Sequence, residues 1–533
     1  MNKYFSHCFG AERMERLTAF FEKILSPSVL LWFSFAVTVV STALSMIFLE
    51  DIYRDVGNVY ATCTRLFSEG HFSEALNPAL PIISIFIAGA VSWLTNLDPL
   101  DSLLLTGGLF YAALIPPLYI LLKRFLSPRL AAWGVLLTVL APKLLRISIS
   151  GMPEPARNFF LVLLLCFVFS FFDRQKWYKT VLIAFAMAGL TLSRSEGFLL
   201  SIMVSFVIFC FTLWIHWKED WKNKFQRSFL YTSLIIIFFL LFLMPRIYQN
   251  YQITGYPTPD ARLNRYIYEY ITSSKPLRDL SDNRNVYAQV VIPRVSRERS
   301  FFKQFGLVVQ QSIRGGYEVY MVFAGIGVLV LLSTRRIRRS LFCDWSPDTS
   351  FATHKLEYLF ILLIYLFHNL IYFKLNISYR YYVFLIPLLM PLTMTGIYFC
   401  WRLLVLFRLQ ILAIVGVFLL LVLQFLNGVA ILREQNFNHK KAGEWIRDHF
   451  KKGKNLRVLN YQSYVVYWID GKIANAFYEG PETRPESASE FDIAIMEADD
   501  ERLLKIFRSR KDVEEVPSPY RNTVVIFRKL CNE

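Results

Sequence analysis

Charge is scarce in this sequence of 533 residues. Only 19% of the residues are Asp, Glu, Lys or Arg, whereas 55% are hydrophobic. Soluble domains carry about 25% charged residues, so this composition excludes an ordinary soluble protein. Apolar runs of 17 or more residues recur along most of the chain, and each is a candidate membrane-spanning helix. The sequence therefore predicts a polytopic membrane protein.

Paired cysteines are also missing. The seven cysteines show no regular spacing, which argues against a metal or disulfide framework. No cleavable signal peptide is expected, because the first apolar run is itself as long as a span. The net charge of +17 could suggest nucleic acid. However, the basic residues lie between apolar runs, as the positive-inside rule predicts, so no nucleic-acid partner is expected.

The segments rich in Lys and Arg that connect the apolar runs define one consistent membrane topology. If all of them are cytoplasmic, the chain crosses the membrane about eleven times, with the N-terminus cytoplasmic and the C-terminus extracytoplasmic. A bacterial inner membrane is the expected location. The predicted spans lie near 27–49, 100–122, 130–147, 156–172, 180–193, 197–215, 228–246, 317–334, 357–374, 381–400 and 408–430.

One apolar run should not cross. Residues 78–95 are short for a span and begin with Pro78 and Pro81. A crossing there would also move every later basic connecting segment to the outer side of the membrane. We expect an external helix on the outer leaflet. The stretch 56–69, which follows Glu50, Asp51 and Asp55, has an amphipathic period and is expected to lie there too.

Two domains follow from these patterns. Residues 1–433 are predicted to form the transmembrane domain, with outer loops at 50–99 and 247–316. Residues 434–533 show the periodicity of a small extracytoplasmic α/β domain. Its helices are expected at 442–450 and 499–507, and its strands at 456–460, 472–477, 491–497 and 523–529.

Charged residues are absent from the middle of the predicted spans. Transporters of protons or ions usually place acids or bases there. His368 is the one ionisable residue of note, and it is interpreted as a packing residue. The polar groups gather instead at the outer span ends, which suggests an enzyme that takes one substrate from the lipid phase. These groups are Asp51, Asp55, Arg146, Glu154, Arg157, Arg194, Glu196, Arg246, Lys374 and Arg380.

Three outer motifs each allow a purely structural interpretation. "ISGMPEPARN" (149–158) carries Glu154, an acid suited to a helix start. "LSRSEGF" (192–198) could be a hairpin with an Arg194–Glu196 contact. "NISYRYYVFLIPLLMP" (376–391) places Arg380 where a flanking arginine could simply snorkel. These alternatives stay open on the residues alone.

The order of the motifs carries a resemblance. An outer acid precedes an amphipathic stretch ending in "FSEGHF"; then come "SGMPEP", "SRSEG", "NYQITGYPTP" and "RYYVFLIPLLMP". This order resembles the GT-C superfamily of membrane glycosyltransferases, most of all the branch with protein O-mannosyltransferases and aminoarabinose transferases. The resemblance implies an all-α polytopic membrane domain with a C-terminal α/β domain. It also implies transfer of a sugar from a polyprenyl-phosphate donor to a lipid, glycan or protein acceptor, by an inverting mechanism on the extracytoplasmic face.

The resemblance also implies a catalytic base. In the family pattern an acid precedes a "G-x-F" motif, with a Tyr and a small residue between them. Asp55, Tyr60, Ala61, Gly70 and Phe72 match this pattern best. A carboxylate can take the proton of an acceptor hydroxyl, and an exposed Asp is ionised near neutral pH. Asp55 is therefore the predicted base, ahead of Asp51 and then Glu50.

The remaining candidates are assigned to the substrates. Glu154 matches a second acidic site, predicted to orient the acceptor or a divalent cation, and metal use stays open. Arginine presents planar, permanently charged donors that suit a leaving phosphate. The donor-phosphate candidates are Arg194, Arg380 and Arg146, and the substrate-contact candidates are Tyr60, Glu196 and Tyr379.

Two other classes of function remain: a flippase or transporter of a lipid-linked glycan, and a noncatalytic scaffold.

Overall fold

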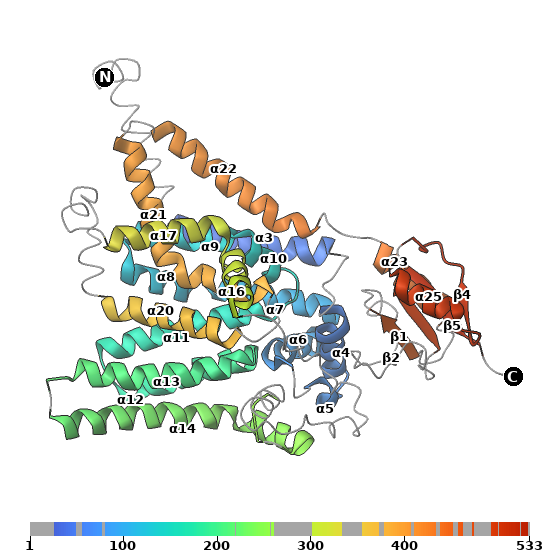
Figure 1. The fold of residues 1–533 in the computed structure, drawn as a ribbon, viewed down its shortest axis with the longest axis horizontal. Helices are drawn as coiled ribbons and strands as arrows, with labels where there is room; N and C mark the ends of the chain where they lie inside the picture. The colour runs from blue at the N-terminus through green and yellow to red at the C-terminus, as the bar shows by residue number, and fades with distance from the viewer. Residues whose placement is uncertain are drawn as a thin grey trace, which may run out of the picture.

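The molecule consists of a bundle of long helices followed by a small α/β domain (Figure 1). The fold class predicted from the sequence is thereby confirmed. The computed structural model describes residues 26–49, 56–76, 80–218, 220–255, 257–260, 301–332, 354–372, 378–406, 410–432, 438–450, 457–461, 472–473, 492–498, 500–522 and 524–530.

The first half of the bundle contains helices that begin with strong start signals. Ser26, Asp98, Ser127 and Asp220 each accept a hydrogen bond from the first turn of the helix that follows, as expected for N-caps. The elements are α3 (Pro27–Phe48), η1 (Val56–Ala61), α4 (Thr62–Ser68), α5 (Phe72–Ala75), α6 (Ile82–Thr95), α7 (Pro99–Ala113), α8 (Ile115–Phe125), α9 (Pro128–Leu140), α10 (Pro142–Ser148), α11 (Glu154–Asp173), α12 (Trp177–Ser193), α13 (Glu196–Ile215) and α14 (Trp221–Thr254).

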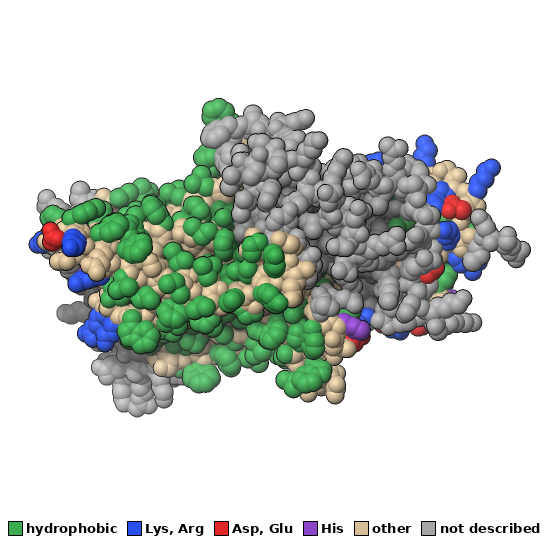
Figure 2. Space-filling model, turned by 90° about the horizontal axis from the view of Figure 1, so that it is seen from below, with side chains coloured by type: hydrophobic (Ala, Val, Ile, Leu, Met, Phe, Trp, Pro, Cys, Tyr) green, Lys and Arg blue, Asp and Glu red, His purple; other side chains and the backbone are tan. Residues whose placement is uncertain are grey.

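The second half of the bundle consists of further helices. Its elements are α16 (Phe301–Gly315), α17 (Glu318–Leu332), α20 (Lys355–Tyr372), η3 (Tyr379–Tyr382), α21 (Leu385–Leu406), α22 (Gln410–Gly428) and η4 (Val429–Leu432). Figure 2 shows hydrophobic side chains spread over one face of the bundle, whereas charged side chains are seen at its left end and on the opposite side of the molecule. This distribution fits a protein whose sides contact lipid.

Five helices of the described chain are long and apolar enough to cross a membrane, and two bent pairs raise this number to seven. Four shorter apolar helices coincide with other predicted spans: Trp177–Ser193, Leu356–Ile371, Leu385–Trp401 and Phe418–Gly428. The remaining short one is α6. Its 14 residues extend about 21 Å, less than the roughly 30 Å of a hydrocarbon core. That α6 does not cross remains a prediction, but its length agrees with it.

The stretch 56–69 corrects one expectation. We expected its apolar face to lie on the membrane, but η1 and α4 pack that face against protein. Cys63 and Phe67 are buried, and the Phe67 ring lies so close to Gly89 of α6 that a side chain there would clash. The amphipathic period marked a buried face correctly, but the covering surface is α6 rather than lipid.

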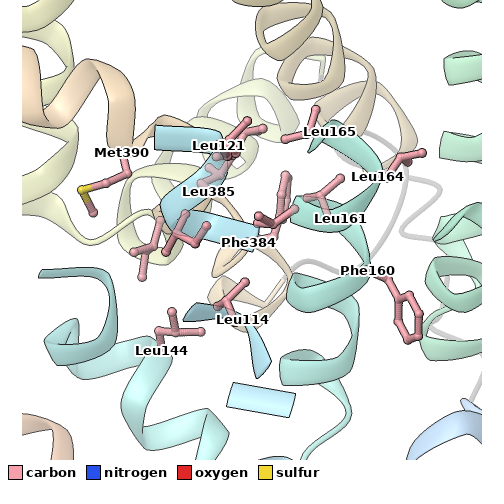
Figure 3. Packing of buried hydrophobic residues seen from close by; sticks show 14 of the residues in the cluster. Leu114, Leu121, Leu144, Phe160, Leu161, Leu164, Leu165, Phe384, Leu385 and Met390 are labelled. Carbon is pink, nitrogen blue, oxygen red and sulfur yellow. The ribbon is translucent and has the colours of Figure 1, made fainter. Parts of the chain in front are cut away.

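The bundle core is formed by apolar side chains from helices far apart in the sequence. Leu114, Leu121, Leu161, Phe384 and Leu385 lie close together (Figure 3) and are all nearly or fully buried. At the predicted cytoplasmic end, Arg124 of α8 binds Asp173 of α11 at 2.5 Å and Glu357 of α20 at 2.7 Å. One guanidinium therefore links three helices at this end.

The C-terminal domain is a five-stranded sheet with a helix on each face. The strand order is β2-β1-β3-β5-β4; β1 pairs in parallel with β2 and β3, and β5 pairs antiparallel with β3 and β4. Strand β4 was not predicted, because four residues with two central glutamates resemble a loop. The elements are α23 (Asn438–Phe450), β1 (Arg457–Tyr461), β2 (Lys472–Ile473), β3 (Ile493–Glu497), α25 (Glu501–Ser509), β4 (Val513–Val516) and β5 (Val524–Lys529).

Candidate active site

The candidate site lies where α11 and α13 begin and α12 ends. Gly151 has φ +74, a conformation that glycine adopts without strain, and it turns the chain into α11 at Glu154. Only Arg194 and Ser195 separate α12 from α13. This tight turn requires Gly197, because a Cβ atom there would clash with the carbonyl oxygen of Leu190. Glu154, Arg194 and Glu196 are thereby brought together.

Arg194 joins the two acids of this site. Its Nη1 donates to Glu154 Oε1 at 3.1 Å, and its Nε donates to Glu196 Oε1 at 2.9 Å. Glu154 is 0% exposed and Arg194 8%. A buried charge is costly unless it is paired. Loss of any one of these three groups would therefore leave a buried charge without one of its partners. The hairpin contact between Arg194 and Glu196 exists, but it belongs to a larger network.

Arg157 is a second arginine of this network; the sequence placed it in the polar outer layer but assigned it no role. Its Nη1 lies 3.6 Å from Glu196 Oε1 and donates to the backbone oxygen of Tyr381 at 3.1 Å. The guanidinium also lies 5.3 Å from the Phe384 ring centroid. The available signal was its position three residues after Glu154, on the same helix face. Arg157 therefore connects α11 to the segment that begins α21.

Tyr381 brings the two main phosphate candidates together. The Arg194 guanidinium lies 4.7 Å from the Tyr381 ring centroid, and the Arg380 guanidinium lies 5.2 Å from it. Arg380 Nη2 also approaches Tyr381 Oη at 3.4 Å. Both distances are within the range of cation–π attraction. The structure thus brings together residues from 154–157, 194–196 and 380–381, all of which the sequence analysis counted in or beside the polar outer layer.

His368 lies behind this network as a packing residue. Its ring centroid is 4.2 Å from that of Phe384 and 5.3 Å from that of Tyr382. The side chain is 3% exposed. These aromatic contacts agree with the packing interpretation.

Arg146, Tyr379 and Tyr60 are the remaining candidates among the described residues. Arg146 is half-buried on α10, and the contacts given above do not include it. On the same helix Lys143, which was not predicted, binds Glu318 at 2.8 Å and lies 5.8 Å from the ring centroid of the candidate Tyr379. Tyr60 is half-buried and packs against a small apolar cluster that includes Cys63. The sequence did not distinguish Lys143 from Arg146, because both residues precede the motif "ISGMPEPARN".

The three acids Glu50, Asp51 and Asp55 lie outside the described residues, as does Lys374. The described chain resumes at Val56, which is fully buried. A Cβ atom on Gly151 would lie 3.1 Å from Val56 Cγ1. The residue that follows Asp55 therefore packs against the turn that leads into Glu154.

Arg246 of α14 fastens the loop that follows α5. Its Nη1 donates to the backbone oxygen of Leu76 at 2.8 Å, and its Nη2 to that of Leu80 at 3.4 Å. The side chain is almost fully buried. Arg246 was counted in the polar outer layer, and its contacts hold the start of α6 in place.

A divalent cation does not fit the described part of this site. No group of three or more His, Cys, Asp and Glu side chains within it could hold a metal. Both acids present, Glu154 and Glu196, are bound by Arg194, and an adjacent guanidinium repels a cation. We therefore derive no step that uses a metal.

No family model matches the sequence, and no curated protein matches it either. Solved structures do match. ArnT from Cupriavidus metallidurans bound to undecaprenyl phosphate superposes with a TM-score of 0.58 at 13% identity, over 94% of this chain and 98% of that chain. The apo state of that protein gives 0.56 at 12% identity, over 93% and 97%. The chain has the GT-C fold.

A third structure extends the GT-C likeness to another kind of enzyme. The oligosaccharyltransferase of Archaeoglobus fulgidus, tethered to an acceptor peptide with an NVT sequon, superposes with a TM-score of 0.51 at 11% identity. The match covers 88% of this chain and 69% of that chain. The resemblance drawn from the motif order is thereby confirmed at the level of the fold.

Proposed function

We propose that this protein is a membrane glycosyltransferase that uses a polyprenyl-phosphate sugar as donor. It transfers the sugar to a hydroxyl of a lipid, glycan or protein acceptor on the extracytoplasmic face. The observation that carries this proposal is the buried Glu154–Arg194–Glu196 network, joined through Tyr381 to Arg380, at one end of a GT-C fold. Acids and guanidinium groups together at a bundle end suit a donor whose chain stays in the bilayer.

Asp55 is the proposed base. A carboxylate accepts the acceptor's proton while the acceptor oxygen attacks C1 of the sugar. The C1–oxygen bond to phosphate breaks, and polyprenyl phosphate leaves with the electron pair. This single displacement inverts C1. The buried position of Val56 against the turn before Glu154 supports Asp55 over Asp51 and Glu50.

Arg380 and Arg194 are proposed to stabilise the leaving phosphate, with Arg146 as a third candidate. Both of the first two guanidinium groups contact the Tyr381 ring, so one phosphate placed beside this ring could meet both. Arginine is suited to this role because its donors pair with phosphate oxygens. Tyr60, Glu196 and Tyr379 are proposed as further substrate contacts.

Glu154 is proposed to orient the acceptor. Its Oε1 accepts from Arg194, whereas its buried Oε2 has no hydrogen-bond partner among the described residues. A buried acceptor without a partner costs roughly 1–3 kcal/mol. An acceptor hydroxyl that donates a hydrogen bond to Oε2 would therefore be favoured. The C-terminal domain is proposed to cover this face or to help select the acceptor.

The proposal includes a membrane orientation. The N-terminus is proposed to be cytoplasmic, and the C-terminus extracytoplasmic, in a bacterial inner membrane. The positive-inside distribution supports this orientation, and it places the Glu154–Arg194 end of the bundle outside.

The decisive experiment is a transfer assay in liposomes. Purified protein is incubated with a panel of radiolabelled polyprenyl-phosphate sugars and membrane extract as acceptor source. We expect one donor to lose its label to an acceptor, and the Asp55→Asn variant to leave it intact. Movement of a labelled donor across the bilayer without transfer would instead establish the flippase alternative. Neither transfer nor movement with any donor would refute both and favour the scaffold.

A further inference from the structure

Helix α16 has an exposed face that the proposed chemistry does not explain. The helix is bent by 99° from α17, the next helix along the chain, and α17 belongs to the bundle that crosses the membrane. An axis perpendicular to a spanning helix lies parallel to the membrane plane. If α17 spans the membrane, α16 therefore lies roughly parallel to the membrane plane (Figure 1), with its C-terminal end against η3.

The side chains of α16 divide into three sectors. Each residue rotates a helix by about 100°, which places the centres of the sectors roughly 120° apart. Gln304, Val308 and Ser312 are buried against the protein. The second sector is exposed and apolar, and the third is exposed and polar. The apolar sector consists of Phe302, Phe305, Val309 and Ile313, and the polar sector of Lys303, Gln310 and Arg314.

The exposed apolar sector is unusual for a solvated helix. Phe302 is 82% exposed and Phe305 53%. A helix in water would place polar residues over its whole exposed face. Here the exposed face changes from aromatic and aliphatic residues to a sector with two cations. This is the pattern of a helix at the interface, with apolar residues in the acyl region and basic residues at the phosphate level.

Helix α16 is fixed to the candidate site at its C-terminal end. Gly315 lies so close to η3 that a Cβ atom would clash with Tyr382 Cβ, and the Ser312 hydroxyl donates to Tyr365 Oη at 3.3 Å. Any force that fixes the depth of α16 therefore fixes the depth of η3, which carries Arg380.

We propose that the exposed face of α16 docks into the outer leaflet of the bilayer. Phospholipid is the partner: acyl chains cover the Phe302–Phe305 sector, and lipid phosphates attract Lys303 and Arg314. On α17, the next helix along the chain, Val322 and Leu329 are also exposed, as expected of a helix that faces lipid. The docking itself is independent of the proposed transferase activity. Its consequence, that Arg380 is held at the depth of a lipid-linked phosphate, rests on that function.

Fluorescence with site-attached probes tests the docking without an activity assay. Single cysteines at Phe305, Gln310 and Val308 are placed in a background that lacks the seven native cysteines and are labelled with an environment-sensitive dye. The protein is reconstituted in liposomes of phosphatidylethanolamine and phosphatidylglycerol. Quenching is compared between aqueous iodide and a lipid with a nitroxide near the top of its acyl chain. Val309→Cys replaces Phe305→Cys if the latter lowers the melting temperature.

The two exposed sectors should respond oppositely. At position 305 the acyl nitroxide should quench more strongly than iodide, and at position 310 iodide should quench more strongly. Position 308 should resist labelling, which verifies the buried sector. Strong iodide quenching at both 305 and 310 would overturn the proposal, because the helix would then face water. Protection of position 305 from both quenchers would also overturn it, and would indicate cover by residues 261–300 or by a second copy of the chain.

Discussion

Arg194 and Glu154 form an ion pair of 3.1 Å between the end of α12 and the start of α11, forty residues apart in sequence. The carboxylate is fully buried, and the side chain of Arg194 is about one-tenth exposed. Breaking a buried pair leaves an uncompensated charge, which costs roughly 3–5 kcal/mol. Glu154 thus has two proposed tasks: one oxygen holds Arg194, and the other meets the acceptor.

Glu154→Ala should lower both stability and turnover. Removal of the carboxylate leaves Arg194 with one acid instead of two in a nearly dry site. Glu154→Gln keeps an amide oxygen that can accept from Arg194, so its melting temperature should fall less. Thermal melting in detergent and transfer assays measure the two effects. The matched control is Glu514→Gln, which breaks an exposed pair with Arg528 and should change little. Equal melting temperatures for wild type and Glu154→Ala would contradict the role of the pair.

Asp55→Asn should abolish transfer while donor binding survives. The amide cannot take the acceptor's proton, and a lost general base costs about a hundred- to ten-thousand-fold in rate. Turnover and donor binding are measured on the same preparation. Asp51→Asn is the comparison, and it should retain most activity. If Asp51→Asn is inactive and Asp55→Asn is active, Asp51 is the base; if both keep full turnover, the glycosyltransferase proposal is wrong.

Arg380→Lys separates a phosphate contact from a snorkelling anchor. Lysine keeps the charge and can snorkel, but it loses the planar donors that match phosphate. We expect turnover to fall about a hundredfold, equivalent to roughly 3 kcal/mol, with an unchanged melting temperature. Arg521→Lys in the exposed C-terminal domain is the control and should be neutral. Near-normal turnover of Arg380→Lys would leave snorkelling as the role of this residue.

The predicted topology can be tested by cysteine accessibility in intact cells. Thr95 ends α6 and Lys218 follows α13, and both are exposed. If α6 does not cross, an impermeant reagent should label Thr95→Cys from outside and should label Lys218→Cys only after permeabilisation. A cysteine appended after Glu533 should be labelled from outside. Labelling of Lys218→Cys in intact cells would refute the predicted topology.

Hydropathy and residue order made much of this molecule predictable. Apolar runs fix helices because an unpaired backbone is too costly in lipid, and these helices appear where they were expected. The elements of the C-terminal domain followed from their periodicity, apart from β4, where Glu514 and Glu515 concealed an edge strand. The motif order also indicated the GT-C fold, which the superpositions confirm.

The sequence by itself determined which segments are helices and at which span ends the polar groups lie. Only the tertiary structure decided which of these groups meet. Arg157 reaches the backbone of Tyr381 across 224 residues of sequence, and Lys143, which the sequence did not single out, lies beside Tyr379. Likewise, the helical spacing of the apolar residues in 56–67 indicated that one face is buried. It did not indicate that α6 covers this face. The physical reason is that periodicity reports whether a face is removed from water, whereas its partner depends on how distant helices pack.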